Sequence, residues 1–253
     1  MAMQLEFGGK RIFVAGGAVG LGRRISAAFH DLGAMVAING RSAAEVEQAI
    51  GALGGGTRLL AAPGSLCETE ERRGVVARAI EALRGLDVLV CAPMAGSVRQ
   101  IEDITLDYWQ RIIEEGPKSA FFVAQACVAA LRETRGVIVN VASVIGLVGG
   151  PQGVAAYAAA SGAIVQMSRM MALELAAEGI RVNTVCPAWP EGDSSGASAV
   201  LREYFRSRSP LRRVASADEC AAAVLYACAA ASAYTTGAVL VADGGITSGH
   251  YVG

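Results

Sequence analysis

Residues 11–22 read RIFVAGGAVGLG, an apolar run of strand length that passes directly into a glycine-rich turn. Gly16, Gly20 and Gly22 have the spacing G-x-x-x-G-x-G, and a helix-like stretch follows them. Glycine is needed in such a turn when the backbone bends sharply and a helix N-terminus must approach a phosphate group closely. The stretch therefore predicts a strand–turn–helix unit with a dinucleotide site. The alternative is that the glycines serve close packing alone.

The rest of the chain repeats this alternation of strand-length and helix-length segments. Seven continuously apolar runs predict strands at 11–15, 34–39, 57–62, 86–92, 136–143, 180–186 and 238–242. Helix-like stretches lie at 21–32, 42–52, 67–84, 104–132, 153–178 and 216–230. Continuous apolar runs are typical of parallel strands that are covered on both faces. We therefore expect an α/β fold of the Rossmann type: a doubly wound parallel sheet with helices on both faces and a ligand crevice at the carboxyl ends of its strands.

No linker divides the sequence, so we expect residues 1–253 to form a single domain. The one break in composition is WPEGDSSGAS at 189–198, which is rich in glycine and serine. It is too polar for a core and longer than a typical connection, and it predicts a loop near the crevice.

Composition narrows the classes of protein that the chain can be. Hydrophobic residues make up 53% of the sequence and charged residues 18%, which favours an oligomer because a partner usually covers excess apolar surface. The net charge of −1, without a basic face, argues against a nucleic-acid partner. No apolar run reaches the roughly 18 residues of a membrane span, and the N-terminus lacks a signal-peptide pattern. Six cysteines without a C-x-x-C pair and two isolated histidines predict a cytoplasmic protein with neither disulfides nor a metal site.

Three stretches together resemble the short-chain dehydrogenase/reductase family, and the similarity runs through nearly the whole chain. The loop AGGAVGLG at 15–22 is similar to the family's cofactor loop, which implies an NAD(P) site. GVIVNVASVIG at 136–146 resembles the strand that carries the family's catalytic serine, here Ser143. YAAASGAIVQ, beginning at 157, resembles the helix that starts with the catalytic tyrosine, here Tyr157. The loop residues that the resemblance assigns to the cofactor are Gly16, Gly20, Leu21 and Gly22.

The same resemblance exposes departures at the positions that carry the chemistry. The family's tyrosine is followed four residues later by a lysine, but this sequence has Ser161, and the catalytic asparagine aligns with Gly116. In the family the lysine lowers the tyrosine pKa and holds the nicotinamide ribose. A free tyrosine titrates near pH 10, so a general base at neutral pH needs a shift of about three pKa units, or about 4 kcal/mol. No lysine or arginine lies within one helical turn after Tyr157, and Arg169 is about three turns away.

Other departures fall where the family contacts its nucleotide. Ala15 replaces a threonine, and Ser65 replaces the adenine-binding aspartate. Residues 91–94 replace an Asn-Asn-Ala-Gly stretch, and Ala188 replaces the glycine of a Pro-Gly pair. After the second predicted strand, Arg41 without an acidic neighbour in sequence resembles the NADP-preferring branch, although a surface arginine is an equal alternative. With Ser65 and Ser161 in place, the resemblance implies poor affinity for either nucleotide. Halohydrin dehalogenases share this fold without a nucleotide, but their arginine at the lysine position and their altered glycine loop differ from this sequence.

Two hypotheses follow from the resemblance. The first is a non-catalytic subunit that assembles with a complete family member in a heterotetramer, or with copies of itself in a homotetramer, through the helices at 104–132 and 153–178. The second is an active enzyme that uses Ser143 and Tyr157 without the lysine, either as a reductase or as a cofactor-independent lyase, isomerase or hydrolase. Substrate specificity in the family resides in the loops at 94–104 and 189–208, which contain no diagnostic residue in this sequence.

Overall fold

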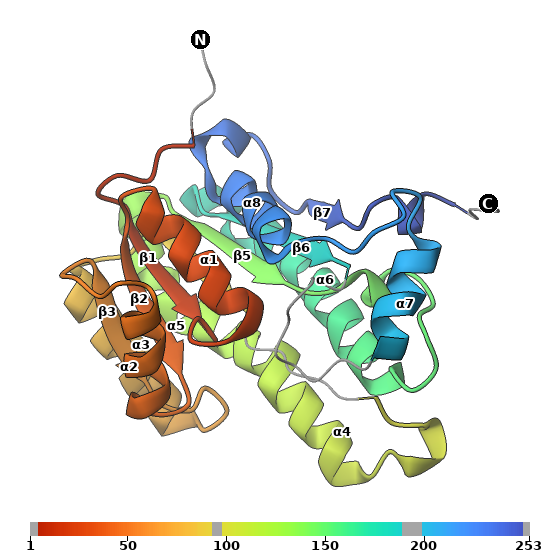
Figure 1. Cartoon of the computed structure of the whole chain (residues 1–253). Helices are drawn as coiled ribbons and strands as arrows, with labels where there is room; N and C mark the ends of the chain where they lie inside the picture. Colours follow the sequence, from red (N-terminus) through yellow and green to blue (C-terminus); the bar gives the residue numbers. More distant parts are fainter. Residues whose placement is uncertain (1–4, 93–97, 189–198, 250–253) are drawn as a thin grey trace.

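The computed structural model describes residues 5–92, 98–188 and 199–249. Within them, parallel strands form one seven-stranded sheet in the order β3-β2-β1-β4-β5-β6-β7 (Figure 1). The strands are β1 Arg11–Ala15, β2 Met35–Gly40, β3 Leu59–Pro63, β4 Val88–Cys91, β5 Val137–Val141, β6 Arg181–Pro187 and β7 Val239–Ala242. The strand order reverses between β1 and β4, and a doubly wound sheet takes its ligand in the crevice at that point. The fold class expected from the sequence is confirmed.

Helices cover both faces of the sheet. Helices α1, α2 and α8 pack on one face, and α3, α5 and α6 pack on the other. The α-helices are α1 Gly20–Asp31, α2 Ala43–Ala52, α3 Thr69–Leu83, α4 Leu106–Ile113, α5 Ser119–Thr134, α6 Ala155–Leu175, α7 Ala199–Arg208 and α8 Ala217–Cys228. Short 3-10 or π turns are η1 Ile101–Asp103, η2 Glu114–Lys118, η3 Val144–Gly146, η4 Ala176–Glu178, η5 Ala230–Ser232 and η6 Ile246–Ser248.

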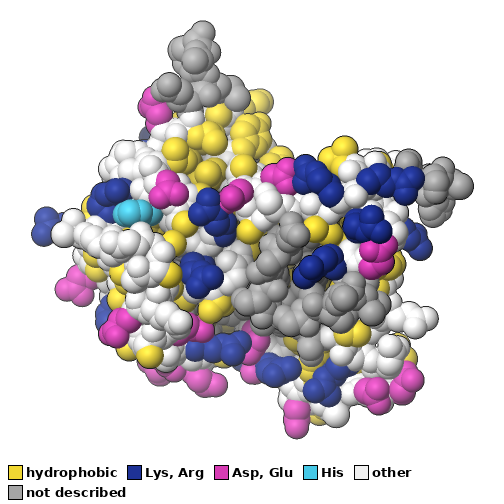
Figure 2. Space-filling model, viewed as in Figure 1, with side chains coloured by type: hydrophobic (Ala, Val, Ile, Leu, Met, Phe, Trp, Pro, Cys, Tyr) yellow, Lys and Arg dark blue, Asp and Glu magenta, His cyan; other side chains and the backbone are white. Residues whose placement is uncertain are grey.

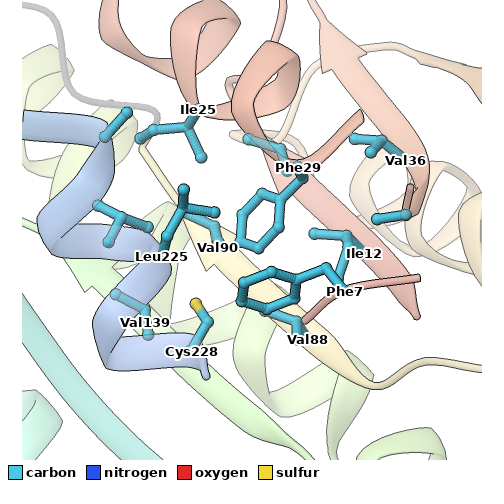
Figure 3. Close-up of a cluster of buried hydrophobic side chains, with 14 of the residues drawn as sticks. Phe7, Ile12, Ile25, Phe29, Val36, Val88, Val90, Val139, Leu225 and Cys228 are labelled. Atoms are coloured by element: carbon cyan, nitrogen blue, oxygen red, sulfur yellow. The ribbon is translucent and has the colours of Figure 1, made fainter. Parts of the chain in front are cut away.

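The core consists of buried side chains on both faces of the central strands. On one face, Phe7 packs edge-on against Phe29 of α1, with ring centroids 4.8 Å apart (Figure 3). Leu225 and Cys228 of α8 belong to the same cluster. All residues of β4 and β5 are buried, whichever face they point to. This double coverage is why the strands appear in the sequence as continuous apolar runs.

Two helical segments differ from the sequence-based expectation. The helix expected at 104–132 is α4 and α5 joined by the π turn η2, in which Gly116 has φ −94° and ψ −108°. Pro117 follows it, and a proline both lacks an N–H group and restricts the residue before it, so the helix kinks there. Helix α7 is not apparent from the sequence because it is short and mixes four charged residues with its apolar ones, of which Leu201 and Phe205 are buried. The predicted loop at 189–198 lies outside the described residues.

None of the helices within the described ranges combines the length and the hydrophobicity of a membrane-spanning segment. The same residues contain no group of three or more His, Cys, Asp or Glu side chains that could hold a metal ion. Figure 2 shows basic and acidic side chains interspersed over one face of the molecule, without a field of one sign.

Candidate functional site

The glycine loop joins β1 to α1 at the centre of the crevice. Gly16 and Gly20 have φ values of +76° and +49°, which side chains rarely adopt. A Cβ on Gly22 would overlap the carbonyl oxygen of Gly16, so this glycine is required for helix and loop to pack together. Val19 caps α1 without a side-chain hydrogen bond. The backbone N–H groups of the first turn, which includes Leu21, are therefore positioned for an anion at the helix N-terminus.

Asn39 holds this loop to the neighbouring strands, a role that the sequence pattern does not reveal. Its Oδ1 accepts a hydrogen bond from the backbone N–H of Gly16 at 3.1 Å. Its Nδ2 donates to the carbonyl oxygens of Ala62 at 2.9 Å and Gly64 at 3.1 Å, at the end of β3. One buried amide therefore fixes the carboxyl ends of β1, β2 and β3 relative to one another.

The structure places two acidic neighbours beside Arg41 that are not evident from the sequence. A guanidinium nitrogen of Arg41 donates to Glu115 Oε1 of η2 at 3.2 Å. The backbone N–H of Arg41 donates to Glu45 Oε2 of α2 at 2.6 Å. The side chain of Arg41 is 72% exposed, and that of Glu115 only 19%. In the sequence, Arg41 resembles a 2′-phosphate ligand because no acidic residue adjoins it. In the folded chain, two glutamates lie beside it.

Ser65, at the position of the family's adenine-binding aspartate, lies directly after β3. Its backbone N–H donates to Glu71 Oε1 of α3 at 2.7 Å, and its hydroxyl accepts from the backbone N–H of Cys67 at 3.2 Å. Burial and the nearby Glu115 raise the pKa of the Cys67 thiol. Cys67 is therefore a protonated neighbour of this site and no nucleophile.

Ser143 and Tyr157 lie on the two segments that meet where η3 packs against α6. Ser143 is 7% exposed, caps η3, and accepts a hydrogen bond from the backbone N–H of Ile145 at 3.4 Å. Tyr157 is half-buried in the same apolar cluster as Ile145. A Cβ on Gly146 would lie 2.6 Å from the backbone nitrogen of Gly162, so η3 contacts α6 backbone against backbone. The apolar cluster and this close backbone contact therefore fix η3 against the start of α6.

Ser161 and Gly116 occupy the positions of the lysine and the asparagine. Ser161 is 0% exposed, and its hydroxyl has no hydrogen-bond partner among the described residues. Gly116 is buried in the kink between α4 and α5. An unpaired buried hydroxyl costs about 1–3 kcal/mol. This end of the crevice therefore contains an unsatisfied polar group where the family has a cation.

Cysteines near the catalytic end are held as thiols. Cys91, the first residue of the stretch that replaces Asn-Asn-Ala-Gly, is buried, and burial raises its pKa to about 12. Burial likewise raises the pKa of Cys186 to about 12. Neither thiol ionises at neutral pH, which argues against cysteine-based chemistry. Pro93 and Met94 of the replaced stretch lie outside the described residues.

A pocket of about 660 Å³ lies beside this end of the site, between α7, the segment 209–215 and the end of β7. Phe205, Val214 and Ile246 line it and also pack in the cluster that contains Tyr157. Its charged lining residues include Arg213 and Glu219, which pair at 2.6 Å. The pocket suits an apolar group, and its segments, scattered in sequence, give no motif that could have predicted it.

Comparisons with known proteins agree with the fold and cover nearly the whole chain. A family model described as enoyl-(acyl carrier protein) reductase matches residues 16–247. A meso-2,3-butanediol dehydrogenase of Serratia marcescens is 29% identical over 96% of this chain and 97% of its own length. An inactive 2-(S)-hydroxypropyl-CoM dehydrogenase 2 of Xanthobacter autotrophicus is 33% identical over 85% of this chain and 96% of its own. A short-chain type dehydrogenase/reductase from Mycobacterium marinum, a solved structure, is 30% identical with a TM-score of 0.89, over 97% of this chain and 98% of that one.

The two halves of the crevice differ in how well they fit the dinucleotide that the resemblance implies. At the adenosine half, the first turn of α1 offers N–H donors to a pyrophosphate, and Glu45 and Glu71 offer acceptors to ribose hydroxyls and to the adenine amino group. At the nicotinamide half, Ser161 supplies no charge and only an enclosed hydroxyl. The donor and acceptor set therefore fits the adenosine half and does not fit the nicotinamide half.

Proposed function

Because the chain belongs to the short-chain dehydrogenase/reductase family, we propose that it is a non-catalytic subunit of a heteromeric NAD(P)-dependent oxidoreductase. It would act as an assembly scaffold for an active paralogue whose substrate is an alcohol, a ketone or a hydroxyacyl compound. The observation that carries this proposal is the buried hydroxyl of Ser161 at the lysine position, which has no hydrogen-bond partner within the described ranges.

Electrostatics support this proposal at Tyr157. A phenol becomes a general base at neutral pH only if a nearby cation stabilises its phenolate. The residue one turn along α6 is the neutral Ser161, and the first cation of that helix, Arg169, is exposed and donates to Gln166. Gly116 removes the side chain that would continue a proton relay. Tyr157 therefore lacks the groups that activate it in the family.

A relative supports the same proposal. The protein from Xanthobacter autotrophicus that is 33% identical bears the name of an inactive dehydrogenase, whereas the one from Serratia marcescens is named a dehydrogenase without that qualifier. The family therefore includes members of this length and similarity that have lost activity.

The outer surfaces of three helices offer an interface for a partner. Met170 and Leu173 of α6 are 47% and 73% exposed. Further exposed apolar side chains on α4 and α5 are Leu106, Trp109, Phe121 and Phe122. Exposed apolar side chains of this size favour burial against another subunit. We infer that a complete family member covers them in a heterotetramer, with a homotetramer as the alternative.

Co-expression with a complete Ser–Tyr–Lys paralogue tests the proposal. We expect the two chains to co-purify, and we expect dehydrogenase activity to depend on the paralogue's tyrosine and on the presence of this chain. In isolation, this chain should bind NAD and NADP more weakly than the low micromolar range, because each missing contact costs about 1–3 kcal/mol. Low micromolar affinity for either nucleotide, measured by calorimetry, or turnover by the chain alone would refute the proposal.

One observation favours the second candidate, an active enzyme without the lysine. Tyr157 packs in the cluster that contains Ala142 and Val144, the two neighbours of Ser143 in sequence. A neutral tyrosine is the right proton donor for a reductase or for a cofactor-independent lyase or isomerase. The adjoining apolar pocket could take the body of its substrate. Turnover by the purified chain that is lost in Tyr157→Phe would establish this function.

A further inference from the structure

Two buried oxygen atoms on neighbouring strands have no hydrogen-bond partner among the described residues. They are Oδ1 of Asn140 in β5 and Oγ1 of Thr184 in β6, and the two residues are 0% and 1% exposed. Asn140 and Thr184 are register partners in the parallel pairing of these strands. Neighbouring strands lie about 4.8 Å apart, and register partners project to the same face of the sheet. The two unpartnered oxygens therefore belong to adjacent side chains on one face.

This face of the sheet is the one that α6 covers. Side chains two residues apart on a strand point to the same face. The neighbours of Asn140 and Thr184 on that face pack with α6 in two apolar clusters, Ile138 and Val182 in one and Ala142 and Cys186 in the other. Asn140 and Thr184 therefore form a polar step between two apolar clusters beneath α6.

The orientation of the Asn140 amide is fixed by α6. Its Nδ2 donates to Oγ of Ser168 at 2.9 Å, and the hydroxyl of Ser168 donates its own proton to the carbonyl oxygen of Ile164 at 2.7 Å. A hydroxyl has one proton, so Ser168 cannot also donate to a flipped amide. Oδ1 of Asn140 is therefore an acceptor on the other side of the amide from Ser168.

A water molecule is the ligand that suits two such atoms. Although Asn140 and Thr184 are register partners, no hydrogen bond joins the hydroxyl of Thr184 to Oδ1 of Asn140. Buried waters in proteins typically bridge polar groups that lack other partners. Both oxygens are uncharged and lie between apolar clusters, which disfavours an ion because its charge would be buried without a counter-charge.

We propose that β5, β6 and α6 enclose a binding site for one ordered water molecule. The water donates to Oδ1 of Asn140 and accepts from the hydroxyl of Thr184. It completes a chain of hydrogen bonds that runs from Thr184 through Asn140 and Ser168 to the backbone of α6, and this chain ties the helix to both strands. The inference concerns the support of α6 beneath the crevice, so it holds whether or not the chain is catalytic.

A high-resolution crystal structure of the full chain tests the site directly. We expect a peak of electron density within about 3.2 Å of both Oδ1 of Asn140 and Oγ1 of Thr184. A direct hydrogen bond between the two side chains, or no density between them, would overturn the inference.

Thr184→Val tests the site in solution, because it replaces the hydroxyl by a methyl group of similar size. With the water in place, this variant loses one of the two groups that hold it and leaves Oδ1 of Asn140 unpaired. The Tm should then fall by about 2–4 °C. Without the water, the variant removes an unsatisfied hydroxyl and the Tm should rise, which would contradict the inference.

Ser161→Ala is the matched control. It removes the third unpartnered side-chain oxygen of the described residues, which lies about 10 Å along α6 from Ser168. A Cβ on Gly146 would lie 2.7 Å from the Cβ of Ser161, so the backbone of η3 packs against this residue. Ser161→Ala should raise the Tm while Thr184→Val lowers it, and a rise in both would overturn the inference. If Thr184→Val fails to fold by circular dichroism, the crystal structure of the wild-type chain decides alone.

Discussion

Helix α6 has a polar group that is buried at one place and apolar side chains that are exposed at another. At the crevice, the hydroxyl of Ser161 is buried without a hydrogen-bond partner in the described part of the chain. Further along, Met170 and Leu173 expose apolar side chains to solvent. A partner subunit can cover the exposed side chains and gain stability from them, but it cannot relieve the buried hydroxyl. The contrast favours a helix that serves assembly at its outer surface and no chemistry at its crevice end.

The largest effect is expected from a charge on the outer surface. Met170 is exposed, whereas Met167, three residues earlier on α6, packs against the core. Met170→Glu would bury an unpaired carboxylate in the interface, at about 3–5 kcal/mol, which raises the dissociation constant of the oligomer by about 100- to 4,000-fold. Size-exclusion chromatography with light scattering measures this change, and the activity of the complex should fall with it.

Leu32→Glu is the matched control for Met170→Glu. Leu32 is a 36% exposed apolar residue at the end of α1, on the opposite face of the sheet. This variant should assemble as the wild type does. A wild-type chain that elutes as a monomer, with or without a complete paralogue, would contradict the contrast between the two ends of α6.

A lysine at position 161 tests the crevice end directly. Ser161→Lys should lower the free energy of unfolding by about 3 kcal/mol, because it places an ammonium group at a fully buried position. Urea denaturation measures the loss. Ala159→Lys, on the same turn of α6 but exposed, is the control and should change stability little. Unchanged stability of Ser161→Lys would show that this end still accommodates the family's lysine.

The sheet was predictable from the sequence, whereas the kink and α7 were not. Buried parallel strands such as β4 and β5 must be apolar on both faces, so each strand stands out in the sequence. The kink at Gly116 depends on one Gly-Pro pair within an otherwise helical pattern. Helix α7 is only ten residues long and four of these are charged, so the apolar stripe that contains the buried Leu201 and Phe205 gives a weak periodic signal.

Some residues of the candidate site could likewise be predicted from the sequence, and others could not. Ser143 and Tyr157 are predictable because each belongs to a local motif next to a strand or at a helix start. The charges around Arg41 are not, since Glu115 lies 74 residues away in sequence and meets it only through the fold. The role of Asn39 in holding the glycine loop could not be predicted for the same reason, because its hydrogen-bond partners lie at the ends of two other strands. Contacts between distant segments leave no spacing that a sequence pattern can show.

Replacing each of the two buried serines of α6 by alanine should change the free energy of unfolding by a smaller amount, and in opposite directions. Ser161→Ala removes an unsatisfied hydroxyl and places a better helix former, so it should raise the free energy of unfolding by about 1 kcal/mol. Ser168 is equally buried, but it accepts from Asn140 Nδ2 at 2.9 Å and donates to the carbonyl oxygen of Ile164 at 2.7 Å. Ser168→Ala should therefore destabilise the protein by about 1–3 kcal/mol. Urea titrations that give both changes the same sign would show that the Ser161 hydroxyl is satisfied.

The smallest effect is expected at the residue that the family makes essential. Tyr157→Phe removes one hydroxyl and keeps the ring in its apolar cluster, so the complex should assemble normally. If the crevice end performs no chemistry, the activity of the complex should stay within a few-fold of the wild type. The same substitution in the partner's own catalytic tyrosine is the positive control and should abolish turnover. A loss of about a hundredfold, or about 2.7 kcal/mol, in this chain's variant with assembly intact would place proton transfer at Tyr157 and assign the chemistry to this chain.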